Sequence, residues 1–350
     1  MRRSHLVFLV ATIVFLTLAL RSFSTLFSLL VEDAATDIIH PSEIPAINST
    51  LNSSLPQLIP KIIHQTYINA SIPERWRLPH ESCIKLHPDY EYKFWSDEDS
   101  HTFIQKEYPW FLETFEQYQH NIQRADAIRY FVLAHYGGVY IDLDNGCRRR
   151  LDPLLSFPAW VHLTDPTGIS NDGMGATPRH PFFLYVIDQL QVYNRQWVLP
   201  YITIMYSTGP LFLSVVWKRY MQLHWKEGVD WNGRVRVLTP EEYYQRETSF
   251  FDLHYGGSSW HGDDAKFIKS MGEHWLSVTV AGFTFAAGFG FCVWWVYRRI
   301  LQLRILRDYR AADGSSPSLL SRHGFRLPLW RAWQWRNGKR EYELVEQHDT

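Results

Sequence analysis

The sequence lacks an excess of either charge. Its 350 residues include 35 Lys and Arg against 36 Asp and Glu, for a formal net charge of −1. This balance gives no sign of nucleic-acid binding, so nucleic acid is not an expected partner. The sequence also has no internal repeat and no long low-complexity run, which argues against a repeat architecture. With 46% hydrophobic and 16% aromatic residues, the chain can bury one sizeable core.

Cysteine is scarce as well, with three in the whole chain. Cys292 falls in a long apolar run, which leaves Cys83 and Cys147 in the middle of the chain. In an oxidising compartment these two are candidates for a disulfide, but the sequence alone does not show that they meet.

Two uncharged apolar runs bracket the middle of the chain. Leu6–Leu20 is short for a bilayer, but a helix that continues past a snorkelling Arg21 makes an N-terminal membrane anchor. A cleaved signal peptide is the alternative, although Ala19-Leu20-Arg21 is a poor small-residue cleavage site. Trp275–Tyr297 is long enough to cross a bilayer and has aromatic residues at both ends, so it predicts a transmembrane helix.

Charges beside these runs predict their orientation. Arg2-Arg3 precedes the first run and Arg298-Arg299 follows the second, and basic residues tend to stay on the cytosolic side. Both termini are therefore expected in the cytosol and the middle of the chain in the lumen. Three N-glycosylation sequons, which fit only a lumenal segment, begin at Asn48, Asn52 and Asn69.

Between the apolar runs, strand-like and helix-like segments alternate and predict one α/β domain. The expected strands are Lys61–Gln65, Tyr90–Trp95, Val139–Leu143, Trp160–Leu163 and Arg234–Leu238. Helices are expected after a cap at Ser96, from about Pro181, and over Leu211–Met221. The predicted organisation is an anchor over residues 1–31, a lumenal stem over 32–59, the α/β domain over 60–273, a transmembrane helix over 274–297 and a cytosolic basic tail over 298–350.

The most informative stretch is Ala125–Asp144. Its first half has helical spacing, and Gly137-Gly138 supplies the left-handed backbone that commonly ends a helix. Val139–Leu143 then alternates as a strand, so Asp142 and Asp144 are expected on one face at its end. In α/β proteins, ligands bind at the carboxyl ends of strands.

Two carboxylates this close repel each other unless a cation or a shared proton relieves them. Their oxygens suit Mg²⁺, Mn²⁺ or Ca²⁺, and such an ion can bridge the diphosphate of a nucleotide. The pattern therefore predicts an Asp-x-Asp site for a metal and a nucleotide sugar. The alternative is a polar turn, since Asp144-Asn145-Gly146 is good turn chemistry. The helix, the glycine pair and the apolar strand before it favour the site.

The same stretch resembles glycosyltransferase family 32. The resemblance rests on Ala125-Asp126-x-x-Arg129 followed by Gly137-Gly138-x-Tyr140-x-Asp142-x-Asp144, and it extends from Ile59 to about Ser270. It implies a GT-A-like nucleotide-sugar-binding domain, with a mixed, mostly parallel sheet between helices. It also implies a metal-dependent hexosyltransferase that retains the anomeric configuration of the sugar.

The resemblance further implies roles for individual residues. Asp126 and Arg129 would reach the hydroxyls of the donor sugar, with a surface ion pair on one helix face as the alternative. Asp142 and Asp144 would hold the metal.

A later segment, from His254 to His261, resembles the closing loop of the same family. One of these two histidines would complete the metal shell, while Ser259 and Trp260 would cover the diphosphate.

The remaining candidates lie near the ends of other predicted segments. His64, Gln65 and Trp95 are candidates to line the nucleotide pocket, although Trp95 fits a core position equally well. Asn171 and Asp172, in a predicted loop with Gly173, are candidates for the acceptor side.

Within the family, the resemblance points to transfer of mannose from GDP-mannose to the membrane lipid inositol phosphoceramide. The implied metal is Mn²⁺, with Mg²⁺ and Ca²⁺ as alternatives, and the implied location is the membrane of the Golgi or endoplasmic reticulum. A regulatory membrane subunit is a further expected partner. One alternative is a mannosyltransferase that extends protein-linked glycans, which the Trp275–Tyr297 run disfavours. The other is a non-catalytic membrane subunit, which the intact Asp-x-Asp pattern disfavours.

Overall fold

A computed structural model of the chain describes residues 10, 12–14, 16–18, 20, 37–45, 56–164, 167–225, 233–253 and 262–313. The chain divides into two compact units, Met1–Ser270 and Met271–Thr350. Each unit is described by itself.

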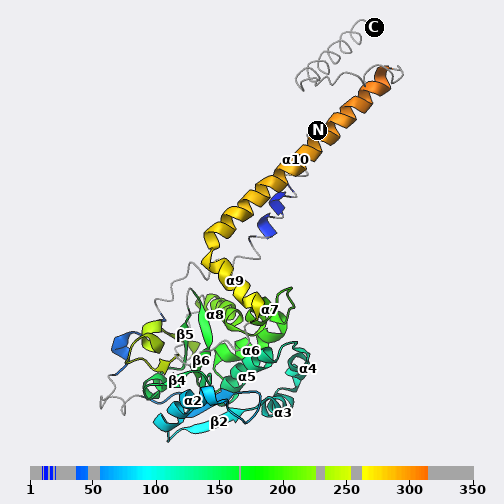
Figure 1. The fold of residues 1–350 in the computed structure, drawn as a ribbon. Helices are drawn as coiled ribbons and strands as arrows, with labels where there is room; N and C mark the ends of the chain where they lie inside the picture. The colour runs from blue at the N-terminus through cyan, green and yellow to red at the C-terminus, as the bar shows by residue number, and fades with distance from the viewer. Residues whose placement is uncertain are drawn as a thin grey trace. The chain divides into compact units, whose positions relative to one another are not determined.

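Every strand in the described part of the chain belongs to the first unit (Figure 1). Its strands are β1 (Ile62–Thr66), β2 (Glu91–Trp95), β3 (Gly138–Ile141), β4 (Gly146–Cys147), β5 (Ala159–Leu163), β6 (Ile169–Ala176), β7 (Arg236–Leu238) and β8 (Phe251–Asp252). Its longer helices are α2 (Glu74–Leu86), α3 (Asp97–Glu107), α4 (Pro109–Gln117), α5 (Asn121–Tyr136), α6 (Pro181–Tyr193), α7 (Pro200–Ser207) and α8 (Pro210–Trp225). The short helical segments are η1 (Pro41–Glu43), η3 (Asp152–Ser156) and η5 (Glu241–Gln245). Helix α9 (Asp263–Glu273) crosses the division, and α10 (Trp275–Asp313) belongs to the second unit.

The main sheet has six strands in the order β2-β1-β3-β6-β5-β7. Strand β6 runs antiparallel to both of its neighbours, whereas the other three pairings are parallel. The predicted mixed, mostly parallel sheet is therefore confirmed. A small second sheet pairs β4 with β8.

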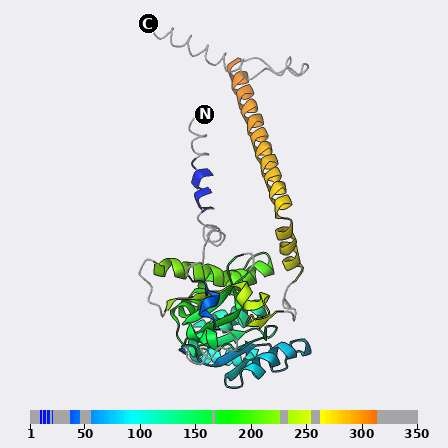
Figure 2. The same cartoon turned by 90° about the vertical axis from the view of Figure 1, so that its left-hand side faces the viewer.

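Apolar side chains fill both faces of the main sheet. On one face, α5, α6 and α8 contribute a large cluster that includes Phe131, Phe183 and Val216. On the other, Val139 and Ile141 pack with residues of α2, η3 and η5. Helices α3 and α4 belong to the first cluster through Phe103 and Phe111, and Figure 2 shows the green α8 along one side of the unit. The sheet thus lies between two layers, with helices on both faces.

The transition from α5 to β3 follows the sequence prediction closely. Gly137 and Gly138 both have positive φ, at 65° and 94°. A Cβ on Gly137 would lie 2.6 Å from Pro178, and one on Gly138 would lie 2.7 Å from the carbonyl oxygen of Ile62. Glycine is therefore required at both positions by conformation and by close packing.

Two expectations about local structure are wrong. The strand predicted over Val139–Leu143 ends at Ile141, so Asp142 and Asp144 lie in the turn that follows it. Asn171-Asp172-Gly173, expected as a loop, lies inside β6. Gly173 and Gly175 of this strand face Tyr243 and Trp160. A Cβ would lie 2.0 Å from the Tyr243 hydroxyl oxygen and 2.3 Å from Trp160 Nε1. Space for aromatic rings, rather than a turn, explains these glycines.

The predicted stem is partly docked rather than free. Ile38 forms a parallel bridge with Val237 of β7. The backbone amide of Ile39 donates to Val237 and that of Val237 donates to Asp37, each over 2.8 Å. Asp37 pairs with Arg234 at 2.9 Å, and Glu43 pairs with Arg236 at 2.8 Å. Residues 37–45 therefore extend the sheet beyond β7, where sequence composition had indicated only a linker.

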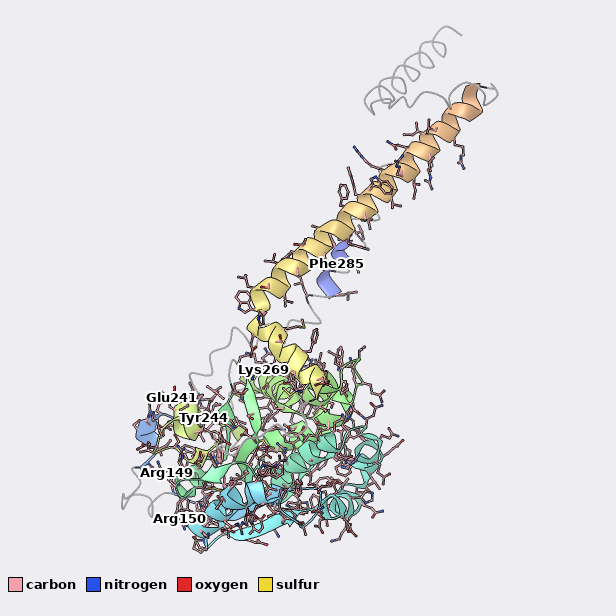
Figure 3. The ribbon with its side chains drawn as sticks, in the orientation of Figure 1. Arg149, Arg150, Glu241, Tyr244, Lys269 and Phe285 are labelled. Atoms are coloured by element: carbon pink, nitrogen blue, oxygen red, sulfur yellow. A yellow bond between two sulfur atoms is a disulfide. The ribbon has the colours of Figure 1, made fainter. Side chains whose placement is uncertain are left out.

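The second unit contains a helix that is long and apolar enough to cross a membrane. The candidate span is Trp275–Arg307, with the predicted segment at its start. Helix α10 continues to Asp313, so the predicted tail over 298–350 begins as helix rather than as irregular chain. Figure 3 shows Phe285 projecting outward from α10, and its side chain is exposed. The described residues between 10 and 20 are also helical.

Candidate active site

Asp142 lies at the carboxyl end of β3, where its carboxylate receives hydrogen bonds from two neighbours. Arg129 of α5 approaches it with both terminal nitrogens, at 3.3 Å to Oδ2 and 3.2 Å to Oδ1. The Tyr140 hydroxyl donates to Oδ1 over 2.7 Å. Helix α5 and β3 are consecutive and antiparallel, so the early turns of α5 lie beside the end of the strand.

Arg129 also holds a second carboxylate. Its guanidinium lies 3.3 Å from Asp126, one helical turn earlier. Asp126 accepts further hydrogen bonds from Asn171 at 3.0 Å and from the Thr208 hydroxyl at 3.2 Å. Asp126 and Arg129 are only 4% and 7% exposed. The pair is therefore part of a buried network, not the surface ion pair considered as the alternative.

Burial changes the proton affinity of this network. It raises the pKa of Asp142 to about 8, against the opposing effect of Arg129, and the neighbouring charges of Asp144 and Asp172 add to the rise. Burial also raises the pKa of Asp126, although Arg129 opposes that shift. At the end of β3, burial thus disfavours the charged form of these carboxylates more than Arg129 favours it.

Asp144 differs from Asp142 in having no partner. In the part of the chain that the structure describes, its half-buried carboxylate receives no hydrogen bond from another residue's side chain. Burial, followed by the charge of Asp172, raises its pKa. An unpaired carboxylate in such surroundings favours a bound cation.

Asp172 on β6 belongs to a separate group of polar residues beside this site. It accepts hydrogen bonds from His162 at 2.6 Å, from Asn145 at 2.9 Å, from Tyr243 at 3.3 Å and from Ser170. Burial alone would raise its pKa, but His162 and these donors hold the pKa well below its usual range. The rings of His162 and Tyr243 stack at 3.5 Å.

Sequence reasoning missed His162, Asn145 and Tyr243. His162 was the most visible of them, because it is a charged-type residue inside the apolar Trp160–Leu163 strand. Asn145 was read only as turn chemistry. No sequence pattern indicates Tyr243 as a site residue, because it is 98 residues away from Asn145 in the chain and meets it only through the fold.

Two other predicted residues, His64 and Trp95, lie in the protein interior. His64 Nδ1 accepts from Trp95 Nε1 at 3.1 Å, and His64 Nε2 donates to the carbonyl oxygen of Gly137 at 2.8 Å. Trp95 also packs against Phe103. These contacts fit the core alternative for Trp95, and a role in nucleotide binding stays a prediction.

Gln65 keeps one polar group available. Its Oε1 accepts from His80 at 2.7 Å and from Tyr92 at 3.1 Å. Its buried Nε2 has no hydrogen-bond partner within the described ranges. A buried amide without a partner favours a bound ligand, so Gln65 remains a candidate for donor binding. The predicted residues His254, Ser259, Trp260 and His261 lie outside the described residues.

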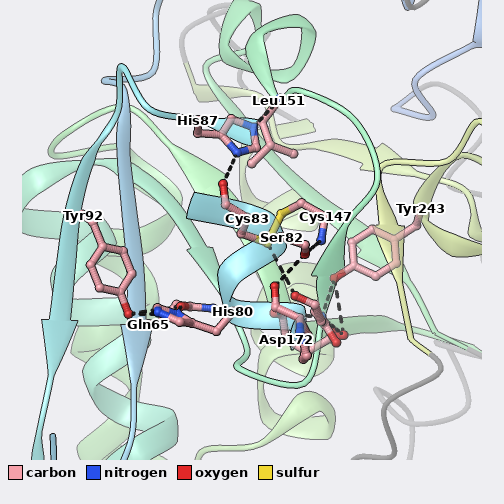
Figure 4. Close-up of a disulfide and its surroundings, with 12 residues drawn as sticks. Gln65, His80, Ser82, Cys83, His87, Tyr92, Cys147, Leu151, Asp172 and Tyr243 are labelled. Atoms are coloured by element: carbon pink, nitrogen blue, oxygen red, sulfur yellow. Dashed lines mark hydrogen bonds between the residues drawn. A yellow bond between two sulfur atoms is a disulfide. The ribbon is translucent and has the colours of Figure 1, made fainter. Parts of the chain in front are cut away.

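A disulfide joins Cys83 of α2 to Cys147 of β4 (Figure 4). The pairing that the sequence left open is therefore formed. Cys147 follows Asp144 by three residues, and its backbone amide is held by Ser82 at 2.8 Å. In Figure 4, Asp172 and Tyr243 lie beside the disulfide. The turn that carries Asp144 is thus fixed to α2 on one side and to β3 on the other.

The carboxylates at this site fit a divalent cation. Within the described ranges there is no group of three His, Cys, Asp or Glu residues arranged to hold a metal. Asp142 and Asp144 nevertheless offer hard oxygen donors, and burial raises the pKa of both, so that a bound cation would favour their charged forms. Hard cations such as Mg²⁺ and Mn²⁺ take ligands of this kind and complete their shells with water or phosphate oxygens.

The fold and this site define a glycosyltransferase. Residues 73–160, which include Asp126, Arg129, Asp142 and Asp144, match the family model described as the glycosyltransferase sugar-binding region containing the DXD motif.

Curated relatives match far more of the chain. Mannosyl phosphorylinositol ceramide synthase CSH1 of Saccharomyces cerevisiae is 51% identical over 288 residues, covering 81% of this chain and 76% of that protein. The synthase SUR1 of the same yeast is 46% identical, covering 93% of this chain and 85% of that protein. Inositol phosphoceramide mannosyltransferase 2 of Schizosaccharomyces pombe is 40% identical, covering 85% of this chain and 90% of that protein. The chain belongs to the family of these mannosyl phosphorylinositol ceramide synthases.

Solved structures are more distant. The PaToxG glycosyltransferase has a TM-score of 0.39 and 18% identity, covering 49% of this chain and 73% of that protein.

Proposed function

We propose that this protein transfers mannose from GDP-mannose to the inositol ring of inositol phosphoceramide. The observation that carries the proposal is the carboxylate pair at the end of β3. Asp142 is held by Arg129 and Tyr140, while Asp144 beside it has no side-chain partner among the described residues. The names of the curated relatives supply the sugar and the acceptor lipid.

The reaction exchanges one bond for another at the anomeric carbon of mannose. A hydroxyl oxygen of the inositol ring forms the new bond to this carbon, and the bond from the carbon to the phosphate oxygen of GDP breaks. GDP leaves with the bonding electron pair, and the hydroxyl proton passes to an oxygen of the leaving diphosphate. We expect the anomeric configuration to be retained, as the family resemblance implies.

The residues of this chain position and balance charge in that exchange. Asp142 and Asp144 would hold a divalent cation, with Mn²⁺ as the first candidate, which supplies positive charge beside the diphosphate when it is bound. Arg129 fixes the orientation of Asp142, and its bridge to Asp126 holds α5 against the strand end. Because these contacts exist before the donor arrives, little reorganisation is needed during the reaction.

The two predicted acceptor residues have different surroundings. Asn171 is 3% exposed and points its amide at Asp126 and at the Tyr130 hydroxyl. It therefore acts as a positioning residue for Asp126. The Asp172 side chain keeps 22% of its surface exposed, so of the two predicted residues it is the one that a substrate at the carboxylate site can reach.

The same proposal places the first unit in the lumen of the Golgi or endoplasmic reticulum, with both termini in the cytosol. The Cys83–Cys147 disulfide supports an oxidising compartment. Asn69 supports it as well, because this sequon lies on the exposed loop after β1. A regulatory membrane subunit remains an expected partner.

A panel of radiolabelled sugar nucleotides, offered with purified lipids and with protein-linked glycans, tests the function directly. We expect label to move only from GDP-mannose and only into inositol phosphoceramide. Transfer into the glycans instead would establish the glycan-extending alternative. No transfer by protein purified with its membrane partners would favour the non-catalytic alternative.

A further inference from the structure

A polar pocket of about 550 Å³ lies outside the carboxylate site. Its lining side chains come from the end of α4, the loop between α4 and α5, the start of α5, the loop after α6, and α7. They are Gln117, Gln119, Gln123, Asn194, Gln196 and Thr203. Its size falls within the range of small-molecule sites, roughly 300–1,000 Å³.

The chemistry of this lining is uniform. Five of the six side chains are carboxamides and the sixth is a hydroxyl, so none of them is ionisable. Each carboxamide presents two N–H donors and one acceptor oxygen, and a hydroxyl both donates and accepts. A ring that carries hydroxyl groups all around it matches such a surface, because each of its hydroxyls also donates and accepts. A charged or apolar ligand does not match it.

Hydrogen bonds link the wall of the pocket to the carboxylate network. Gln123 precedes Asp126 by one turn of α5, and its amide donates to the Ser207 hydroxyl over 2.7 Å. The next residue, Thr208, donates to Asp126 at 3.2 Å. Two adjacent residues at the end of α7 therefore connect the pocket wall to the network around Arg129.

The rim of the pocket has a different composition. Between Asn194 and Gln196, both of which line the pocket, stands the exposed Arg195. Trp197 and Val198 follow and are 49% and 97% exposed. The backbone amide of Trp197 donates to Thr203 Oγ1 over 2.9 Å, which ties this rim to the pocket floor. An exposed tryptophan beside an apolar residue is typical of protein surfaces that touch the membrane interface.

We propose that this pocket is the acceptor subsite and binds the neutral polyhydroxylated ring of the lipid. Arg195 meets the single phosphodiester, and Trp197 and Val198 contact the bilayer surface around the lipid tails. The carboxamides, the cation and the apolar side chains each offer a partner to one part of the lipid, namely its ring, its phosphate and its hydrocarbon. This inference rests on the proposed function and adds the residues that recognise its acceptor.

The first test removes two exposed carboxamides together, Gln119→Ala and Gln196→Ala. We expect the KM for inositol phosphoceramide to rise by about tenfold or more, as loss of two neutral hydrogen-bonding groups predicts. The KM for GDP-mannose should not change. Gln105→Ala, an equally exposed glutamine on α3, is the matched control and should leave both constants unchanged. A rise in the KM for GDP-mannose alone would assign the pocket to the donor, and unchanged constants would overturn the proposal.

The second test addresses the rim. Val198→Asp places a charge on a fully exposed side chain, so folding is not at risk. We expect it to reduce transfer to bilayer-embedded acceptor but to spare a short-chain, water-soluble acceptor. Leu78→Asp, at a residue of α2 that is 62% exposed, should change neither rate. Equal losses on both acceptors, or none, would contradict contact between the rim and the bilayer.

Binding of inositol phosphate to the full-length protein separates this inference from the proposed function, because it requires no turnover. Binding that the Gln119→Ala and Gln196→Ala double variant weakens supports the pocket even if the donor sugar is not mannose. Normal transfer to inositol phosphoceramide by that variant, with undiminished binding, would reject the pocket and leave the proposed function standing.

Discussion

Two arginines in the first unit each join a pair of aspartates, but in opposite surroundings. The buried cluster is Asp126, Arg129 and Asp142, and the exposed cluster is Asp89, Arg150 and Asp152. The contacts are shorter in the exposed cluster, at 2.7 and 2.6 Å, than in the buried one, at 3.3 and 3.2 Å. The Arg150 side chain is 39% exposed, whereas the Arg129 side chain is 8% exposed. Figure 3 shows Arg150 at the surface of the first unit.

The comparison shows that contact length does not determine what such a cluster does. In water, an ion pair contributes about 1 kcal/mol or less, even at short distance. In the interior, loss of one partner leaves a charge that nothing solvates. The pKa values follow the same division. Burial raises the pKa of Asp142 to about 8, whereas the hydrogen bond from Lys61 lowers that of Asp89. Burial thus disfavours the charged form of Asp142, whereas the exposed cluster holds Asp89 in its charged form.

The largest expected effect comes from removing the two arginines in turn. Arg129→Gln leaves two buried carboxylates without their cation, and we expect it to lower the free energy of unfolding by about 3–5 kcal/mol and to abolish transfer. Arg150→Gln should cost about 1 kcal/mol or less and leave transfer unchanged. Denaturant unfolding of the purified proteins measures both. Similar losses in the two variants would show that burial does not separate the clusters.

The disulfide lies between the two clusters in the chain. Cys147 follows Asp144 by three residues and precedes Arg150 by three, and Cys83 belongs to the helix before Asp89. Replacing both cysteines by serine should lower the free energy of unfolding by about 2–4 kcal/mol. Thermal unfolding under oxidising conditions measures the loss. A reductant should bring the wild-type protein to the same midpoint and leave the variant unchanged, and a reductant effect on the variant would point to another cause.

A buried histidine extends the comparison to pH. His64 can accept from Trp95 only while its Nδ1 is unprotonated, and burial lowers its pKa from 6.5 to about 4. The unfolded chain therefore binds this proton more readily than the folded one. The contribution of His64 to stability is complete above pH 6.5 and falls by roughly 3 kcal/mol as the pH drops to about 4.

Unfolding measured across this pH range checks the sign and the size of the effect. His64→Gln should flatten this part of the profile. His101→Gln, at the exposed partner of Glu116, should preserve it. A profile that is equally steep in wild type and His64→Gln would assign the pH dependence to other groups.

The smallest expected effect is that of Asp89→Asn. This change removes one partner of Arg150 and Lys61 at a half-exposed position. It should cost about 1 kcal/mol or less at low salt, and the cost should shrink as salt screens the cluster. Unfolding midpoints at two salt concentrations measure it. A larger cost that salt does not change would show that the exposed cluster contributes to stability as the buried one does.

Much of the framework could be predicted from the sequence because it depends on local patterns. The cap at Ser96 receives a hydrogen bond from the Asp99 backbone, as its capping pattern indicates. Helix α6 buries Phe183, Val186 and Ile187 on the predicted face. Gly137 ends α5 for the expected conformational reason. Each of these features is encoded within a few residues.

The site was only partly predictable, because its contacts join distant segments. Asp142 and Asp144 were identified from their pattern, but β3 ends too early for strand alternation to place them. Asn171 and Asp172 resembled a turn, and only the rings packed against Gly173 and Gly175 explain their place in β6. The docking of residues 37–45 on β7 was missed for the same reason, since a linker composition does not reveal a bridge to Val237.

The central claim is that the carboxylates at the end of β3 balance the charge of the donor diphosphate through a cation. Asp144→Asn tests it most directly, because Asp144 has no side-chain partner within the described ranges and its loss breaks no contact. Asp188→Asn, at an exposed position of α6, is the matched control. We measure transfer from GDP-mannose to inositol phosphoceramide together with the unfolding midpoint. The account predicts that Asp144→Asn loses more than about a hundredfold in rate at an unchanged midpoint, while the control matches wild type. A wild-type rate in Asp144→Asn would contradict it.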